Sequence, residues 1–387
     1  TRNNAGPQPT PLERNMSNTL SHLAFFLPSL SGGGAERVML DVAREAAKHV
    51  ARVDLVLVKH SGAYAQEDPG QVNIIDLHAS RSLVSVPRLA GYLRRERPQA
   101  IISAMPHANI TVLVAARLIR NPAQVIISEH SMMSRHKNAG PKIKMMLRAA
   151  RLLYPRSDRA IACSKQALDT MVQFTGLPSA RAKVIHNPID LERIHDLRDR
   201  APRHAWLSDK VTPVIVTAGR LVVEKDQETL VRALAAMNRT ESRLVIFGEG
   251  PLRAQLEALR DDLGLQNRVD MPGFVANPYA EIARADVLAL PSKSEGFANV
   301  VIEALACNTP VVATCGTGGI ADSLDDGRTV RLVNIGDEIA MASALDTCIA
   351  SPLTDGAMQA IAGRFSLTRG WKEYRDVVLA ALADAGR

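Results

Sequence analysis

The residues best suited to chemistry lie in the second half of the chain, each just after a buried, strand-like run. Glu295 and Glu303 flank the stretch SEGFANVVIEAL, where a strand should give way to a helix. The unsatisfied amides at such a helix start can bind phosphate, whereas a carboxylate can accept paired hydrogen bonds from vicinal hydroxyls. Arg220 and Lys225 lie in TAGRLVVEKD after an earlier strand. Cations converging on one cleft favour an anion such as a diphosphate, with a solvated charge pair as the alternative.

Strand-like runs rich in valine and isoleucine alternate with helical patterns along the chain. This alternation predicts parallel sheets covered by helices on both faces, so the expected fold class is α/β with two Rossmann-like, doubly wound domains facing a cleft. The strands expected in the first half are 23–28, 53–58, 100–105, 124–129, 159–164 and 182–187. Those expected in the second half are 212–220, 242–250, 268–274, 285–292 and 309–314. Ligands on such sheets bind beyond the carboxyl ends of the strands, where the four residues above lie.

Composition and pattern divide the chain into four segments. Residues 1–17 are rich in proline and asparagine, which predicts a disordered leader. Residues 18–188 are expected to form an N-terminal domain. Residues 189–365 should form a C-terminal domain, with the polar stretch 190–210 as the connection. Residues 366–387 are expected to form a helix that packs back on the N-terminal domain.

Charge is distributed unevenly over a chain of otherwise ordinary composition. Residues 1–195 hold 26 Lys and Arg against 14 Asp and Glu, a net of +12, and the remainder holds 21 against 26, a net of −5. A basic half suggests an anionic partner, either nucleic acid or a membrane surface. The four cysteines are scattered, which argues against a disulfide framework or a zinc site and fits a reducing cytoplasm. No apolar run is long enough to span a membrane.

Glycine-rich loops follow three of the expected strands. SLSGGGAERV places Gly33 and Gly34 before a helix expected over 34–50, where a bulky group could come close to the backbone. TAGR contains Gly219, and FGEGP holds Glu249 between two glycines. A plain tight turn is the alternative for the first of these loops.

These motifs, in this order, resemble the GT-B glycosyltransferases of the retaining GT4-type family, whose E-x7-E element matches Glu295 and Glu303. The resemblance extends from about residue 22 to residue 375. By this resemblance the N-terminal domain, 18–188, should bind the acceptor and the C-terminal domain, 189–365, should bind the donor. It implies that Arg220 and Lys225 bind the donor diphosphate, that Glu295 contacts the donor sugar and that Glu303 binds the ribose. The amides of Gly296, Phe297, Ala298, Asn299 and Val300 would hold phosphate, and Glu249, Phe274 and Val275 would lie near the base.

In the family, a histidine after an N-domain strand approaches the sugar's 6-hydroxyl. IISEHS offers His130 for this place, with a purely structural histidine as the alternative. SAMPHANI offers His107 and Asn109 on a neighbouring loop as acceptor contacts. Catalytic roles are therefore expected for Arg220, Lys225, Glu295 and His130.

The implied reaction moves a hexose or N-acetylhexosamine from a nucleotide diphosphate sugar, by family habit a UDP-sugar, to a hydroxyl of a glycan or lipid-linked acceptor. The resemblance implies retention of configuration, no metal and no cofactor, in the assembly of a bacterial surface polysaccharide, lipopolysaccharide or lipid-linked oligosaccharide. Two other classes stay open: a nucleotide-sugar epimerase or phosphorylase of the same fold, and a non-catalytic nucleotide-sugar-binding module.

The segment 135–159 carries eight basic residues and one acid, and its apolar residues recur at helical spacing. Such a helix could lie on an anionic bilayer at about 1 kcal/mol per basic residue, and an ordinary surface helix is the alternative. Nucleic acid is not expected as a partner, because the segment holds a single aromatic residue, Tyr154. The expected location is the cytoplasm, peripheral to the inner face of the cell membrane.

Overall fold

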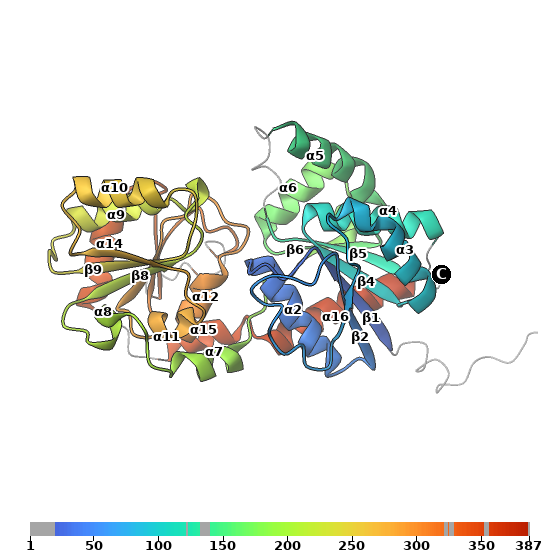
Figure 1. The fold of residues 1–387 in the computed structure, drawn as a ribbon, viewed down its shortest axis with the longest axis horizontal. Helices are drawn as coiled ribbons and strands as arrows, with labels where there is room; N and C mark the ends of the chain where they lie inside the picture. Colours follow the sequence, from blue (N-terminus) through green and yellow to red (C-terminus); the bar gives the residue numbers. More distant parts are fainter. Residues whose placement is uncertain are drawn as a thin grey trace, which may run out of the picture.

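The chain forms two α/β domains that lie side by side (Figure 1). The computed structural model describes residues 20–120, 123–131, 140–320, 324, 329–351 and 356–385. Each domain is built around one parallel sheet with helices on both faces, so the expected fold class is confirmed.

The first domain contains a seven-stranded sheet within the described residues, in the order β3-β2-β1-β4-β5-β6-β7. Its strands are β1 (His22–Leu27), β2 (Arg52–Leu57), β3 (Asn73–Asp76), β4 (Ala100–Ala104), β5 (Gln124–Glu129), β6 (Arg159–Ala162) and β7 (Ala182–Val184). All neighbours pair in parallel, and Leu23 on β1 lies opposite both Val53 on β2 and Ala100 on β4. The central strands are buried on both faces, which is why they are apolar almost throughout.

Two layers of helices cover this sheet. One face packs against α3 (Val86–Glu96), α4 (Pro106–Ile119) and α5 (Pro141–Leu153), and the other against α2 (Gly34–Ala47) and α16 (Leu367–Ala385). The helix α6 (Lys165–Thr175) shows how local sequence sets an element's ends. The Ser164 hydroxyl accepts a hydrogen bond from the Ala167 amide at its start, and Gly176 ends it in a left-handed conformation.

The second domain contains a sheet with the order β10-β9-β8-β11-β12-β13. Its strands are β8 (Val214–Ala218), β9 (Arg243–Phe247), β10 (Val269–Gly273), β11 (Val287–Leu290), β12 (Val311–Thr314) and β13 (Val330–Val333). One face carries α9 (Gln227–Ala236), α10 (Arg253–Asp262) and α14 (Glu338–Ala350). The other carries α7 (Leu191–Arg198), α11 (Pro278–Ile282), α12 (Asn299–Ala306) and α15 (Ala357–Gly363), with the short α8 (Ala205–Ser208) beside them.

The chain passes between the domains twice, and the two passages lie together. The amide of Ile189 donates to the carbonyl of Phe365 at 2.8 Å, and Ile189 forms an isolated parallel bridge with Ser366. Gly370, at the start of α16, packs so closely on Pro188 that a Cβ would lie 2.3 Å from the proline ring. After the second passage α16 lies against the first domain, where Trp371, Tyr374 and other residues join the core under α2.

Most strands agree with their expected positions to within a few residues at each end. The short edge strands β3 and β13 were not expected, because four residues carry too little of a pattern to stand out. The polar stretch 190–210 contains the helices α7 and α8, so it belongs to the second domain's helical layer. The leader 1–17 lies outside the described residues. Within the described part of the chain, no helix combines the length and apolarity needed to cross a membrane.

Candidate active site

In each sheet the order of the strands reverses direction at one topological switch point. This point lies between β1 and β4 in the first domain and between β8 and β11 in the second. Crevices for ligands form beyond the carboxyl ends of the strands at such points. The glycine-rich loop follows β1, the loop with Arg220 and Lys225 follows β8, and the loop with Glu295 follows β11. The topology therefore brings together the motifs that the sequence singled out.

Lys225 and Glu295 form the central pair of this site. The Lys225 Nζ lies 2.6 Å from Glu295 Oε1, which also accepts a hydrogen bond of 2.7 Å from the Ser292 hydroxyl. Glu295 is only 9% exposed, so the ammonium group compensates for much of the cost of burying this carboxylate. The aliphatic part of Lys225 passes along Gly219, where a Cβ would lie 3.4 Å from the Lys225 Cε.

Arg220 has an exposed side chain at the carboxyl end of β8, and its carbonyl accepts a hydrogen bond of 3.0 Å from Gln227. Burial raises the pKa of Glu36 beside the glycine-rich loop of the other domain, and the positive charge of Arg220 is near enough to lower it in part. Gly33 precedes α2, where a Cβ would collide with the Glu36 carboxylate at 2.1 Å.

The start of α12 is held closely between the domains. A Cβ on Gly296 would lie 2.2 Å from the carbonyl oxygen of His130, and one on Gly34 would lie 3.3 Å from Asn299 Nδ2. Ala298 is the N-cap residue and Asn299 the first helical residue. The amides of Asn299 and Val301 donate to the carbonyls of Phe297 and Ala298 at 3.1 and 3.0 Å, and the positive end of the α12 dipole faces the side from which a ligand would approach.

The remaining members of the expected phosphate loop have different surroundings. Phe297 is buried, and its ring stacks on His186 with a centroid distance of 5.3 Å. Val300 is partly buried against the core that continues from the first domain. The side chain of Phe297 therefore fixes the loop to the junction, and only its backbone can contribute to ligand binding.

His130 follows β5 directly, and both of its ring nitrogens have partners. Nε2 lies 3.0 Å from the Ser128 hydroxyl and Nδ1 lies 3.1 Å from the Asn187 side-chain oxygen. Burial lowers the pKa of His130 to about 4, although the bond to Asn187 raises it, so the imidazole is neutral at pH 7. Neither ring nitrogen is left for a sugar hydroxyl in this arrangement, and the group that His130 presents to the second domain is its carbonyl oxygen.

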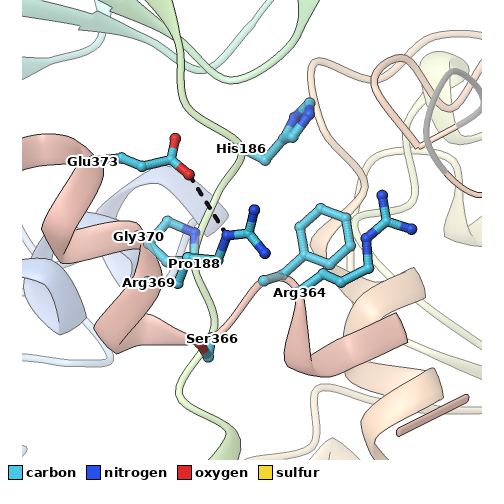
Figure 2. Close-up of a pocket in the computed structure, with 8 residues that line it drawn as sticks. His186, Pro188, Arg364, Ser366, Arg369, Gly370 and Glu373 are labelled. Carbon is cyan, nitrogen blue, oxygen red and sulfur yellow. Dashed lines mark ion pairs between the residues drawn. The ribbon is translucent and has the colours of Figure 1, made fainter. Parts of the chain in front are cut away.

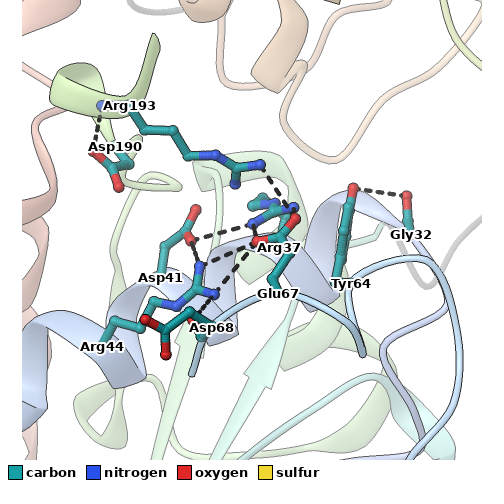
Figure 3. Close-up of polar contacts among 9 residues, drawn as sticks. All are labelled: Gly32, Arg37, Asp41, Arg44, Tyr64, Glu67, Asp68, Asp190 and Arg193. Carbon is teal, nitrogen blue, oxygen red and sulfur yellow. Dashed lines mark hydrogen bonds and ion pairs between the residues drawn. The ribbon is translucent and has the colours of Figure 1, made fainter. Parts of the chain in front are cut away.

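A cluster of charges from the two domains surrounds the end of the site at Glu303. Figure 3 shows Arg193 reaching from α7 toward Glu67 and Arg37 of the first domain. The Arg37 Nη1 donates to Glu67 Oε2 at 2.8 Å, and Arg193 Nη2 donates to Glu67 Oε1 at 3.2 Å. The Arg37 guanidinium also lies over the Tyr64 ring, 3.7 Å from its centroid. Nothing in the sequence singled these residues out, although Arg37 adjoins Glu36 in GGGAER.

Glu303 faces this cluster across a narrow cavity lined by Arg37, Asp41, Arg193, Tyr279 and Asn299. Burial raises the pKa of Glu303 to about 7, with Arg37 lowering it and Asp41 raising it. Burial likewise raises the pKa of Asp41 to about 6. Two carboxyl groups with raised pKa values share this space, and when ionised they can accept hydrogen bonds from the hydroxyls of a ligand.

The residues expected near a base come together at the carboxyl ends of β9 and β10. A Cβ on Gly273 would lie 2.5 Å from Glu249 Oε1, and Glu249 accepts a hydrogen bond of 2.9 Å from Arg253. Phe274 is 70% exposed, and Val275 is partly buried beside it. An exposed aromatic ring at this edge could stack on a planar ligand.

The two residues expected to contact the acceptor are placed differently. His107 is exposed in the first turn of α4. Asn109 is 0% exposed, and its amide donates to Tyr154, Glu129 and the Ser128 carbonyl inside the first domain. The expected acceptor contact of Asn109 is therefore corrected: all its polar atoms are used by the interior network that supports β5.

The basic segment also differs from its expected form. Residues 135–139 lie outside the described part of the chain, and 141–153 form α5. Its apolar side, with Leu147 and Ala150, packs on the first domain's core and is not free for a bilayer. The outward side carries Lys142, Lys144, Met145, Arg148, Arg151 and Leu152, of which Met145 and Leu152 are more than 60% exposed.

A second cavity, of about 100 Å³, lies where the two passages between the domains meet. Figure 2 shows His186, Arg364 and Arg369 around it, with Glu373 paired to Arg369 at 3.9 Å.

Among the residues that the structure describes, no three His, Cys, Asp or Glu side chains are grouped so that they could hold a metal ion.

Comparison with known proteins assigns the family. Residues 32–193 match the model described as "Glycosyltransferase Family 4", and residues 212–351 match "Glycosyl transferases group 1". A Campylobacter jejuni protein is 32% identical over 343 residues, which cover 85% of this chain and 90% of that protein. It is named N-acetylgalactosamine-N,N'-diacetylbacillosaminyl-diphospho-undecaprenol 4-alpha-N-acetylgalactosaminyltransferase. The chain belongs to the family 4 glycosyltransferases.

Solved structures show that this glycosyltransferase has the GT-B fold. HepE of Anabaena, in complex with UDP and glucose, superposes with a TM-score of 0.77 at 23% identity, covering 92% of this chain and 98% of that one. The lipopolysaccharide outer core galactosyltransferase WaaB superposes with a TM-score of 0.68 at 18% identity, covering 92% and 99%. At these identities the likeness concerns the fold.

Proposed function

We propose that this glycosyltransferase moves a hexose or N-acetylhexosamine from a UDP-sugar to a hydroxyl of a lipid-linked or glycan acceptor, with retention of configuration and without a metal. The observation that supports it most is the grouping of Arg220, the Lys225–Glu295 pair and the start of α12 at one switch point. These groups match the two chemistries of a nucleotide sugar, since cations and amides suit its diphosphate and carboxylates suit its hydroxyls.

The chemical role of each group follows from where charge develops. As the bond from the anomeric carbon to the diphosphate breaks, negative charge builds on the leaving oxygen, and Arg220, Lys225 and the amides at the start of α12 stabilise it. The acceptor hydroxyl attacks from the same face and passes its proton to a departing phosphate oxygen. We assign Glu295 to the hydroxyls of the donor sugar and not to a covalent route, since the Lys225 ammonium and the Ser292 hydroxyl stabilise its negative charge through Oε1 and make it a weaker nucleophile.

The acceptor class rests on the relatives. The Campylobacter jejuni relative is named for a diphospho-undecaprenol acceptor. A Mycolicibacterium smegmatis relative, 34% identical over 50% of this chain and 54% of that protein, is named a phosphatidylinositol monomannoside mannosyltransferase. Both names contain a lipid, which supports a lipid-linked acceptor here and action at the surface of the cell membrane.

The outward side of α5 supports contact with an anionic membrane. Its cations lie beside the exposed Met145 and Leu152, a combination that suits an interface of charged headgroups over acyl chains. Sedimentation with vesicles of phosphatidylglycerol and phosphatidylcholine tests this. The triple variant Lys142→Gln, Lys144→Gln, Arg148→Gln should bind less, and unchanged binding would leave α5 as a plain surface helix.

The reaction itself is tested with a panel of nucleotide sugars without acceptor. A transferase should slowly release the free sugar and the nucleotide diphosphate, and EDTA should not reduce this rate. An epimerase would instead yield an isomeric nucleotide sugar, and a binding module would leave the donor intact. Either of those two outcomes would refute the proposal, and analysis of the anomeric product with an accepted lipid would test retention.

A further inference from the structure

Asn187 lies in the first passage between the domains, and its side chain contacts both of them. Its Nδ2 donates to Asn299 Oδ1 at 2.8 Å, and its Oδ1 lies 3.1 Å from His130 Nδ1. The residue is only 4% exposed. Together with the bond from Ser128 to His130, these contacts form one continuous chain of hydrogen bonds from β5 to the first residue of α12.

We propose that Asn187 is a positioning residue, which joins the imidazole of His130 to Asn299 and so fixes the start of α12 against the first domain. This inference rests on the proposed function, because it assigns the start of α12 to the donor's phosphates. Asn187 itself contacts neither reacting group. It acts through His130 and Asn299.

The amide chemistry of Asn187 suits this place. The orientation of its side chain sets a donor toward Asn299 and an acceptor toward His130, which assigns the imidazole proton to Nδ1. Nε2 is then free to accept from the Ser128 hydroxyl, so a donor faces an acceptor at each step of the chain. An aspartate could replace only the acceptor, and a leucine of similar size could replace neither.

The backbone around Asn187 keeps it in one position. Pro188 follows it and restricts its backbone, and the next residue, Ile189, is tied to Phe365 and Ser366 in the second passage. His130 and Asn299, by contrast, belong to separate domains. Both bonds of Asn187 can therefore exist together only when the two domains have the arrangement seen here.

Closure matters because the same surfaces meet at the site. The carbonyl of His130 lies against Gly296, and Gly34 lies against Asn299, so the loop before α12 is enclosed by first-domain backbone. The groups proposed to bind the nucleotide, Arg220, Lys225 and Glu303, all belong to the second domain, so nucleotide binding should not depend on these contacts. Under the proposed function transfer needs them, since an acceptor held by the first domain must reach the sugar. Loss of Asn187 should therefore lower kcat more than it weakens nucleotide binding.

The test combines two substitutions with two readouts, one of which needs no substrate. In Asn187→Leu, kcat for donor hydrolysis and transfer should fall tenfold to a hundredfold, because two partners lose their bonds, while the Kd for UDP stays within about twofold. In Asn187→Asp, the pKa of His130 followed by NMR should rise by more than one unit, because a carboxylate then adjoins Nδ1. Among the described residues, no charged side chain contributes to the pKa of His130 in the native protein.

Asn277→Leu is the matched control. Asn277 is a partly buried asparagine of the second domain whose amide donates to the Leu197 carbonyl at 2.9 Å, away from His130. Its variant should keep both kcat and the His130 titration. Should Asn187→Leu not fold, Asn299→Ala removes the same bond from the other end. Its effect combined with Asn187→Asp should be less than the product of the two single effects.

The inference is overturned if both Asn187 variants keep the wild-type kcat, or if the His130 titration in Asn187→Asp is unchanged. These outcomes differ from failure of the proposed function. In that case no nucleotide sugar is turned over by the wild-type protein, yet the His130 titration would still report whether Asn187 holds the imidazole.

Discussion

Replacement of Gly296 by alanine adds a single methyl group at the point where the domains come closest. The new Cβ would lie 2.2 Å from the carbonyl oxygen of His130, 2.9 Å from its carbonyl carbon and 3.1 Å from the Cα of Ser131. All three are backbone atoms of the first domain, so no side chain can turn away to make room. The alanine therefore fits only if the domains separate locally.

The size of the effect can be worked from these distances. A carbon atom and a carbonyl oxygen in contact lie about 3.3 Å apart, so the two backbones must move by about 1 Å. A misplacement of this size in an active site can cost about 10²-fold in rate. Overpacking by one methyl group costs about 1–3 kcal/mol, and a hundredfold rate loss corresponds to about 3 kcal/mol, so the two approaches agree.

The assay measures donor hydrolysis and UDP affinity in parallel. For Gly296→Ala, kcat should fall about a hundredfold while the Kd for UDP, measured by calorimetry, changes little, because the clash is with the other domain. Gly91→Ala is the control, since a Cβ on Gly91 in α3 would meet nothing within 4 Å. A Gly296→Ala enzyme with the wild-type kcat would show that catalysis does not use this closed arrangement.

Further predictions concern three ionisable residues, Lys225, Glu303 and Glu129. Lys225→Ala should lower kcat by about 10²–10³-fold in steady-state assays, because it removes a cation from the leaving diphosphate and leaves Glu295 unpaired; a twofold loss would place Lys225 outside the site. Glu303→Ala should weaken UDP binding by about 1–3 kcal/mol in calorimetry. Because the pKa of Glu303 is about 7, wild-type UDP affinity should also rise from pH 6 to pH 8, as the carboxyl ionises and accepts from the ribose, and a flat profile would contradict this. Burial raises the pKa of Glu129 from 4.5 to about 7, so between these values the folded protein keeps a proton that the unfolded chain has lost. The free energy of unfolding should therefore fall by about 3 kcal/mol as the pH rises through this range. Chemical unfolding of Glu129→Gln at pH 5 and pH 7 should show a smaller difference than the wild type, and an equal difference would refute the assignment.

The sequence predicted the elements whose pattern is long and local. Strands such as β5 are apolar over their whole length, and the helix start at Asn299 follows directly from the strand–glycine–helix order around Gly296. The gathering of Arg220, Lys225 and Glu295 at one edge follows from parallel topology alone. These features follow from residue patterns within short stretches of the chain and from the parallel order of the strands.

What the sequence did not predict depends on contacts between distant segments. Arg193 and Glu67 are 126 positions apart, and nothing in either segment shows that they pair. Asn109 was expected on a loop that contacts the acceptor, yet it lies in α4, where Glu129 and Tyr154 hold its side chain inside the domain. The apolar side of α5 suited a bilayer and a protein core equally well, and only tertiary packing separates these cases.

The placement of α16 has a consequence for how the protein folds during its synthesis. The first domain completes its core with Trp371, Tyr374 and their neighbours, which are translated after the whole second domain. At about 5–20 residues per second, the interval between Pro188 and α16 lasts on the order of 10–40 s. During that time the apolar surface that α16 later covers, beside α2, is exposed to solvent in the nascent chain, where a chaperone could bind it. The second domain, whose own strands and helices are complete by then, should fold first.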